Sequence, residues 1–364
     1  MSKRKHHYVP RFYLHAFQSA PRQIHLYNIA RKKYILNVSL RDQCYQHKFY
    51  GSDDQLENNL AILDGAIAPA LQGIRNNERV PPQGSDTHDL LLLFVALQSL
   101  RTTVAAARVN ASIDKLAKQV FFNDPRLDGV DLDAVTVGYQ DPVREALLNL
   151  DVLISCIDDL GTHLVVSREG QFITSDNPVF RYNQYCEGIR TSGTIGGLSR
   201  GLQIFVPLSP SHLVVLYDRK VYKFGSRSAK VNIASQRDME YLNLMQLTGA
   251  AENVYFSGDH QIKLIDTIAH KVSRFRKEDS AQIREFLAED RDDRSLVHLF
   301  EKAPNINLDL SFASIQRNAR RVPLFERTRP FRKELPLEEP SIPPSWAGGT
   351  MRFTRPKKAK IRSN

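Results

Sequence analysis

The spacing of apolar and polar positions divides the chain into segments of different character. Residues 23–38 form two short alternating runs around the basic turn "ARKK", which predicts a β-hairpin. Over residues 52–74, leucine and isoleucine recur at helical spacing behind a polar start, Ser52-x-x-Gln55. This pattern predicts an amphipathic helix opened by a capping box.

Two further helices are expected before residue 162. One starts at Ser85 or Asp86 and continues to about residue 122, and its first half is so apolar that it must be largely buried. The other has the punctuation of a helix at both ends, with Asp141 as cap and Pro142 in the first position, and with a glycine at residue 161 after the last turn.

The following third of the chain has a different period. Short β-branched runs separated by turns predict strands, with one helix over residues 236–248 between the last two. The expected strands are 163–167, 171–175, 203–209, 212–218, 220–225 and 253–257. Strands that follow helices in this way predict an α+β fold, a helical bundle packed against an antiparallel or mixed β-sheet.

These segments suggest one domain and a tail. We expect a single α+β domain over residues 1–300, made of a hairpin and helices over 1–160, a mainly β part over 161–260 and a helical part over 261–300. Residues 301–364, rich in proline and charge, are expected to form an extended C-terminal region.

Composition limits the class of protein. The longest apolar run, residues 90–97, is far shorter than the roughly 18 residues that span a bilayer, and no secretory signal follows the basic start. The three cysteines are widely spaced and odd in number, which argues against a disulfide framework or a thiolate zinc site. We therefore expect a cytoplasmic protein without a membrane segment; its oligomeric state stays open.

The net charge of +10 is concentrated near the C-terminus. Residues 347–364 contain no acid and six bases, which could neutralise phosphates and bind nucleic acid without sequence preference. A solubilising appendage is the alternative. The bases are Arg352, Arg355, Lys357, Lys358, Lys360 and Arg362.

The first candidate for chemistry is a pair on the most apolar helix. Gln98 and Arg101 lie one turn apart on the same face. A buried guanidinium needs an acceptor opposite it, either a carboxylate or a bound anion. A structural ion pair would satisfy the same need.

The second candidate is the end of an expected strand in "FITSDNPVF". Asp176 and Asn177 follow the apolar residues, and Pro178 holds Asn177 in an extended conformation. We expect a histidine, Arg101 and Asp176 to converge there, although an ordinary turn has the same composition.

Carboxylates on the first long helix make a third candidate. Glu57 lies beside the apolar stripe, and Asp64 lies two turns further along the same face. With Asp176 and the histidines His6 and His7 they could form a mixed site for a divalent metal, although no spacing is specific and the cofactor stays unknown.

Several motifs together resemble a widespread bacterial family of uncharacterised proteins, also met in phages. They are "HHYVPRFYLHAF" at 6–17, "FYGSDDQLENNLAILD" at 49–64, "QSLRT" at 98–102, "TSDNPVF" at 174–180 and "PLSP" at 207–210. The resemblance covers about residues 5–260 and names no reaction. One departure is Asp64, where the family pattern leads us to expect glutamate.

The polar residues of these motifs form the inventory of an active site. His6, His7, Glu57, Gln98, Arg101, Asp176 and Asn177 offer proton transfer near neutral pH and a fixed positive charge.

We therefore predict a nuclease or phosphodiesterase acting on RNA or DNA, metal-dependent or not, in a phage-defence or toxin setting. The alternative is a non-catalytic binder or sensor of a small anionic ligand or nucleic acid. A histidine plug that only bonds to backbone carbonyls is the structural alternative for "HHYVP".

Overall fold

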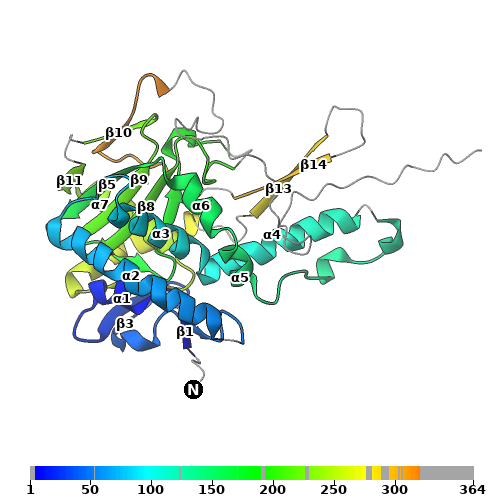
Figure 1. Cartoon of the computed structure of the whole chain (residues 1–364), viewed down its shortest axis with the longest axis horizontal. Coiled ribbons are helices and arrows are strands. Elements are labelled where there is room, and N and C mark those ends of the chain that lie inside the picture. The colour runs from blue at the N-terminus through cyan, green and yellow to red at the C-terminus, as the bar shows by residue number, and fades with distance from the viewer. Residues whose placement is uncertain are drawn as a thin grey trace, which may run out of the picture.

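The computed structural model describes residues 5–319, except 53, 123, 170, 190–192, 226–228, 276–280, 288–294, 302–303 and 305. Its helices are α1 (Arg11–Leu14), α2 (Gln55–Asn77), α3 (Asp86–Leu100), α4 (Thr103–Phe122), α5 (Pro142–Leu147), α6 (Leu150–Ile157), α7 (Gln236–Gly249) and α8 (Ile262–Ala269). The arrangement is α+β, as predicted (Figure 1).

Two larger sheets form the centre of the molecule. The five-stranded sheet has the order β11-β5-β9-β8-β7 and is antiparallel except for the β11–β5 pair. The antiparallel four-stranded sheet has the order β3-β2-β12-β6. Their strands are β2 (Gln23–Asn28), β3 (Lys33–Ser39), β5 (Gly161–Ser167), β6 (Thr174–Ser175), β7 (Phe180–Tyr182), β8 (Gln203–Ser209), β9 (His212–Tyr217), β11 (Lys230–Ile233) and β12 (Asn253–Phe256).

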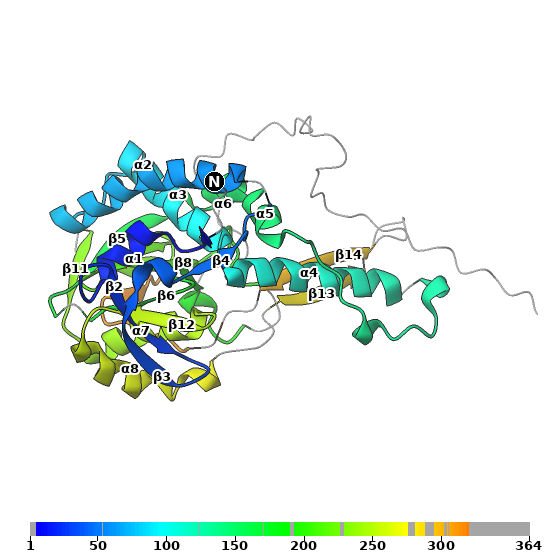
Figure 2. The same cartoon turned by 90° about the horizontal axis from the view of Figure 1, so that it is seen from below.

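Helices cover the sheets on two sides, α2 and α3 on one and α7 and α8 on the other (Figure 2). Alternate residues of one strand therefore enter different cores. Leu164 and Val166 of β5 pack in the core with α2 and α3, whereas Val165 packs with α7 and α8. Burial on both faces explains why β5, β8 and β9 each contain a continuous apolar run, "LVV", "IFVPL" and "LVVL".

We predicted one helix over residues 85–122, but the structure has two, α3 and α4. α3 and α4 meet at an angle of 57°. Ser85 caps α3 as predicted, but Arg101 leaves the helical region and Thr102 starts a new helix, its Oγ1 accepting the Ala105 N–H at 3.2 Å. The periodicity of both halves is helical, so it does not mark the break.

Three other boundaries differ from the prediction. α2 is capped by Asp54 without a side-chain hydrogen bond, so the capping box at Ser52 does not form. The segment after Asp141 is two short helices, α5 and α6. Of the expected strand 171–175, only the last two residues are strand.

The end of the described chain also needs correction. After α8 the chain forms a hairpin, β13 (Ala281–Leu287) with β14 (Ser295–Glu301), where we predicted helix. β15 (Ala313–Ile315) then pairs with β10 (Tyr222–Phe224), and buried residues just before it, Leu308 and Leu310, pack with α7 and α8. The folded unit thus continues past residue 301.

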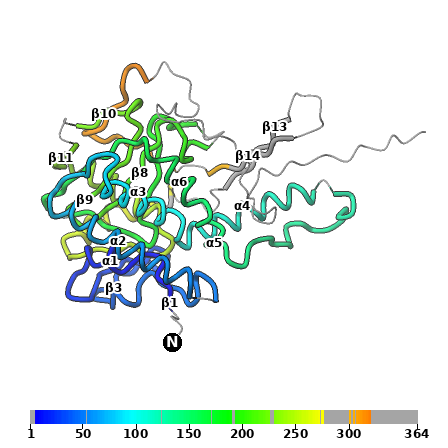
Figure 3. Tube along the Cα trace, in the orientation of Figure 1, coloured from blue at the N-terminus to red at the C-terminus, as the bar shows by residue number. Residues whose placement is uncertain are grey.

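A third short pairing joins the N-terminal strand β1 (Lys5–His7) to β4 (Tyr45–His47). In the part of the chain that the structure describes, no single helix is long and apolar enough to cross a membrane. The bent pair α3 and α4 passes the test by length and composition only. The chain trace in Figure 3 shows α4 leading away from the rest of the fold.

Candidate functional site

The N-terminal segment is anchored by burial, as its aromatic content suggests. Val9, Tyr13, Leu14 and Phe17 have no exposed surface. The Tyr13 hydroxyl donates to the Pro207 carbonyl at 2.6 Å, so this segment is fixed to the five-stranded sheet. Tyr8 and Val9, which follow β1, are therefore held beside the helices rather than free in solvent.

Arg101 lies at the corner between α3 and α4 and is fully buried. Its Nε donates to Gln98 Oε1 at 2.9 Å, and Gln98 Nε2 donates to the Tyr8 carbonyl at 2.9 Å. The predicted pairing of Gln98 with Arg101 is thus present, and it connects the helix corner to the N-terminal segment.

The carboxylate opposite Arg101 is Asp64 of α2. Arg101 Nη1 lies 2.9 Å from Asp64 Oδ1. The two atoms form an ion pair without good hydrogen-bond alignment, since Asp64 Oδ1 has no hydrogen-bond partner among the described residues. Burial raises the pKa of Asp64, and Arg101 opposes this shift. The prediction that Arg101 needs an acceptor is confirmed, but the acceptor is Asp64 and not Asp176, the residue that we predicted.

Asp176 has a different role from the one expected. Its two oxygens accept the backbone N–H groups of Ala251, Glu252 and Asn253 at 2.6, 2.7 and 2.9 Å. Burial raises its pKa to about 6 in spite of these three bonds. Asp176 therefore organises the turn between α7 and β12, and it does not serve as the partner of Arg101.

Asn177 joins three segments. Its Oδ1 accepts from the Thr102 hydroxyl at 3.0 Å, and its Nδ2 donates to the Gly249 carbonyl at 2.9 Å. The motifs that contain Arg101 and Asp176 do therefore meet in space, but the contact runs through their neighbours Thr102 and Asn177.

A cleft of about 400 Å³ opens beside Arg101, lined by β1, α1, α2 and the α3–α4 corner. Arg101 Nη2 is buried and has no hydrogen-bond partner among the described residues. The cleft is lined by Lys5, His7, Pro10, Arg11, Phe12, Glu57, Leu60, Ala61, Asp64 and Arg101. Glu57 and Asp64, predicted to share one face of this helix, both line the cleft.

The two adjacent histidines separate. β1 is a strand, so Lys5 and His7 share one face and His6 takes the other. His6 is fully buried, stacks on Tyr50 and accepts the Tyr50 N–H at Nδ1. His6 is therefore a structural residue, although its bond is to a backbone N–H and its Nε2 lies 3.8 Å from Asp54 Oδ1. His7 makes the bond to a backbone carbonyl that the structural alternative predicted, and it also lines the cleft.

His7 is held in a defined tautomer. Its Nε2 donates to the Arg41 carbonyl at 3.0 Å, which leaves Nδ1 with the lone pair. Burial lowers the pKa of His7, and the charges of Arg11 and Lys5 lower it further. His7 is therefore neutral at pH 7 and can accept a proton.

Lys5, Arg11 and Phe12 were not among the predicted site residues. The period of two in a short N-terminal strand could have indicated Lys5, because it places that residue beside His7. No comparable signal marked the other two, since α1 is only four residues long. No group of three His, Cys, Asp or Glu side chains suited to a metal ion exists within the described ranges, so the predicted mixed metal site is not formed by these residues.

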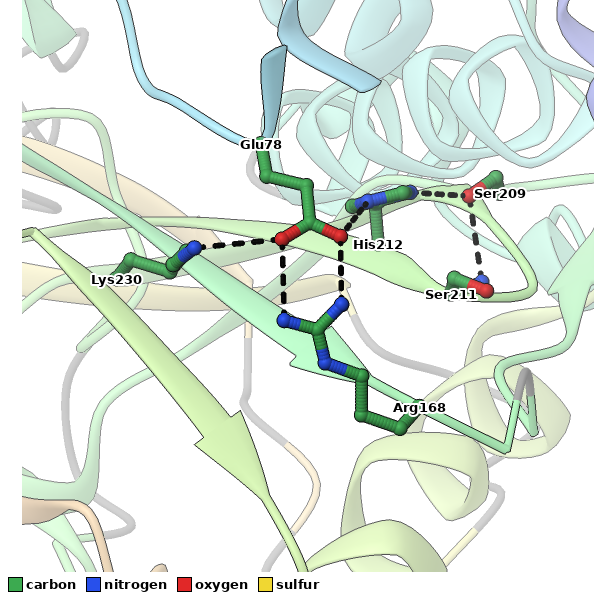
Figure 4. Close-up of polar contacts among 6 residues, drawn as sticks. All are labelled: Glu78, Arg168, Ser209, Ser211, His212 and Lys230. Carbon is green, nitrogen blue, oxygen red and sulfur yellow. Dashed lines mark hydrogen bonds and ion pairs between the residues drawn. The ribbon is translucent and has the colours of Figure 1, made fainter. Parts of the chain in front are cut away.

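A second polar cluster lies at the end of α2 (Figure 4). Glu78 pairs with Arg168 at 3.0 and 3.3 Å, with Lys230 at 3.3 Å and with His212 at 3.7 Å. The other nitrogen of His212, Nδ1, lies 2.8 Å from Ser209 Oγ. Burial would raise the pKa of Glu78, but the three bases outweigh it and the pKa is lowered.

This cluster connects α2 to the ends of β5, β9 and β11. Ser209 Oγ also accepts the Ser211 N–H at 3.2 Å, which is the local hydrogen bond of a serine turn. The cluster therefore fastens a helix to a sheet. The basic residues from Arg352 to Arg362, predicted to bind nucleic acid, lie outside the described residues.

Comparison with known proteins identifies a family but no function. Residues 5–260 match a family described as "Protein of unknown function (DUF4238)". The chain belongs to this family. No curated protein and no solved structure matches it. All cleft residues fall inside the matched range, so the site belongs to the shared domain.

Proposed function

We propose that the cleft beside Arg101 binds a phosphodiester and that the protein hydrolyses it, in RNA or DNA. The observation that carries the proposal is Arg101 Nη2, a buried nitrogen without a hydrogen-bond partner among the described residues, on a guanidinium-bearing residue that lines the cleft. An anion bound in the cleft would satisfy it, and phosphate oxygens match the guanidinium geometry.

The charges around the cleft support an anionic ligand. Lys5 and Arg11 line it together with Arg101 and the carboxylates Glu57 and Asp64. Arg101 pairs with Asp64 and Lys5 with Asp42, which leaves Arg11 as a further cation of the lining. In this proposal Arg101 holds a phosphate oxygen, and Arg11 adds attraction at the mouth.

His7 would supply the base. Its Nδ1 would take a proton from a water molecule as the water oxygen bonds to phosphorus and the bond to the leaving sugar oxygen breaks. The leaving oxygen would receive its proton from Glu57, because Asp64 is the charged partner of Arg101.

A second function has one observation in its favour. A cleft of about 400 Å³ has the size of a pocket for a small molecule rather than of a groove for a polymer. Recognition of a small phosphate-bearing ligand without hydrolysis is therefore the alternative, and it uses the same cations.

Incubation of the purified full chain with RNA and DNA oligonucleotides, with and without EDTA, distinguishes the two. Cleavage that inorganic phosphate inhibits supports hydrolysis in the cleft. If no cleavage occurs but phosphate raises the thermal midpoint of the protein, the result supports ligand binding without hydrolysis. If cleavage occurs without EDTA and stops when EDTA is added, the reaction requires a metal ion.

A further inference from the structure

The cleft beside Arg101 has an apolar part that the proposed chemistry does not use. Besides its ionisable residues, it is lined by Pro10, Phe12, Leu60 and Ala61. Pro10 and Leu60 are buried, whereas Phe12 is half-buried and Ala61 is exposed. An anion alone makes no use of an apolar lining, so these residues indicate a ligand that carries an apolar group beside its charge.

Phe12 brings a phenyl ring to this lining, and the core holds that ring in place. The ring centroids of Phe12 and Phe94 lie 6.4 Å apart with the planes tilted by 59°, and Phe94 is fully buried. Tyr13 and Leu14, which follow Phe12 in α1, are also fully buried. An aromatic ring that is already fixed can stack on a flat ligand without a further loss of conformational freedom.

Cationic residues lie in the same lining. Arg11 precedes Phe12 in the sequence and is exposed, and Arg101 has the buried Nη2 without a hydrogen-bond partner among the described residues. A ligand that satisfies both parts of the lining carries a phosphate close to a flat ring. A nucleotide has this combination, because one sugar joins its phosphate to its base.

The volume of the cleft limits the ligand to a small unit. About 400 Å³ lies near the lower end of the range of small-molecule pockets, roughly 300–1,000 Å³. The bases of a duplex are already stacked and paired, so a base would have to leave the duplex to reach Phe12. An unpaired nucleotide, either free or at the end of a single strand, needs no such step.

We propose that the cleft holds one unpaired nucleotide, with its phosphate at Arg101 and its base stacked on Phe12. This inference rests on the proposed function and names the ligand of the same site. It makes Phe12 the residue that distinguishes a nucleotide from other phosphate esters, because a sugar phosphate has no base to cover the ring. Every base has a π-face, so one base should bind about as well as another.

Calorimetric binding to the purified full chain tests this inference with adenosine monophosphate, ribose 5-phosphate and inorganic phosphate. Adenosine monophosphate should bind about 10-fold more tightly than ribose 5-phosphate, because stacking of one base on an aromatic ring contributes a factor of about that size. Equal affinity for these two probes would overturn the inference and leave anion binding in the cleft intact. Absence of binding by all three would contradict the proposed function as well.

Substitutions assign the effect to Phe12. Phe12→Leu keeps an apolar side chain without the ring, so its affinity for adenosine monophosphate should fall about 10-fold, while its affinity for ribose 5-phosphate stays unchanged. Phe12→Tyr keeps the ring and should bind as wild type does. Phe122→Leu is the matched control, at a phenylalanine of α4 that is 79% exposed and does not line the cleft. Wild-type affinity for adenosine monophosphate in folded Phe12→Leu would overturn the inference.

Competition distinguishes a strand end from a free nucleotide. A short single-stranded oligonucleotide with a terminal phosphate should displace adenosine monophosphate, and the same sequence in a blunt duplex should displace it much less. Equal displacement by the two would contradict the requirement for an unpaired base. If neither displaces it, the ligand is a free nucleotide, which contradicts hydrolysis of RNA or DNA in this cleft but supports the nucleotide site.

Discussion

Arg101 Nη1 lies 2.9 Å from Asp64 Oδ1, and of the two residues only Arg101 is completely buried. Removal of the carboxylate in Asp64→Ala leaves a buried charge without its partner, which costs about 3–5 kcal/mol. Thermal unfolding of the purified variant measures this cost. A loss below about 1 kcal/mol would mean that Arg101 does not depend on Asp64.

Phosphate should rescue the same variant. An anion that enters the cleft replaces the missing carboxylate, so millimolar phosphate should raise the thermal midpoint of Asp64→Ala more than that of wild type. The control is Arg101→Met with Asp64→Leu, which has neither charge and can fold well because a buried ion pair is replaceable by apolar residues. If phosphate stabilises this double variant equally, the effect is a general salt effect.

His7 gives the activity its expected pH dependence. Burial, Arg11 and Lys5 lower the pKa of His7 from its ordinary value of 6.5. A general base must be unprotonated, so the acid limb of kcat/KM should lie below pH 6.5. Arg11→Gln removes one lowering charge and should move that limb to higher pH, whatever it does to the rate. An unmoved limb would assign it to another group.

Asp176 is predicted to affect stability rather than chemistry. The folded state keeps the Asp176 proton up to about pH 6, whereas the unfolded chain releases it near the ordinary value of 3.8. Between these values the folded state binds more protons, so the free energy of unfolding should fall as pH rises. Asp176→Asn should remove this slope. The free energy of unfolding, measured for wild type and Asp176→Asn from pH 4 to pH 7, should depend on pH with a different slope in the two proteins, and not differ only by a constant.

Glu78 should make a modest, salt-dependent contribution. It pairs with Arg168, Lys230 and His212, but it is partly exposed, so Glu78→Gln should cost only about 1 kcal/mol. High salt should reduce the difference from wild type. Asp309→Asn is the matched control, because Asp309 pairs with Arg237 where both side chains are more than 60% exposed. Its effect should be close to zero.

Much of the fold follows from local patterns. The hairpin at 23–38, the helix at 236–248 and the strands β5, β8 and β9 are confirmed because period and composition act within each segment. The two outer strands of the same sheet, β7 and β11, were not predicted. The break at Arg101 was missed because both sides of it are good helix. The hairpin β13–β14 and the pairing of β15 with β10 depend on contacts distant in sequence.

The candidate site was predictable in kind but not in detail. The cost of a buried guanidinium required an acceptor near Arg101, and this requirement is met. Which carboxylate meets it depends on how α2 packs on α3, and local pattern does not contain that. Asp176 was plausible because strand ends collect functional groups, but a carboxylate also satisfies three backbone N–H groups in a turn.

Cleavage of labelled RNA and DNA oligonucleotides by wild type and His7→Ala tests the central claim most directly. Both proteins must have the same thermal midpoint, and His15→Ala, a change at an exposed histidine of the same segment, serves as the control. The account predicts cleavage by wild type and by His15→Ala, and a loss of about 100-fold or more in folded His7→Ala. No cleavage by wild type, or full activity in folded His7→Ala, would contradict it.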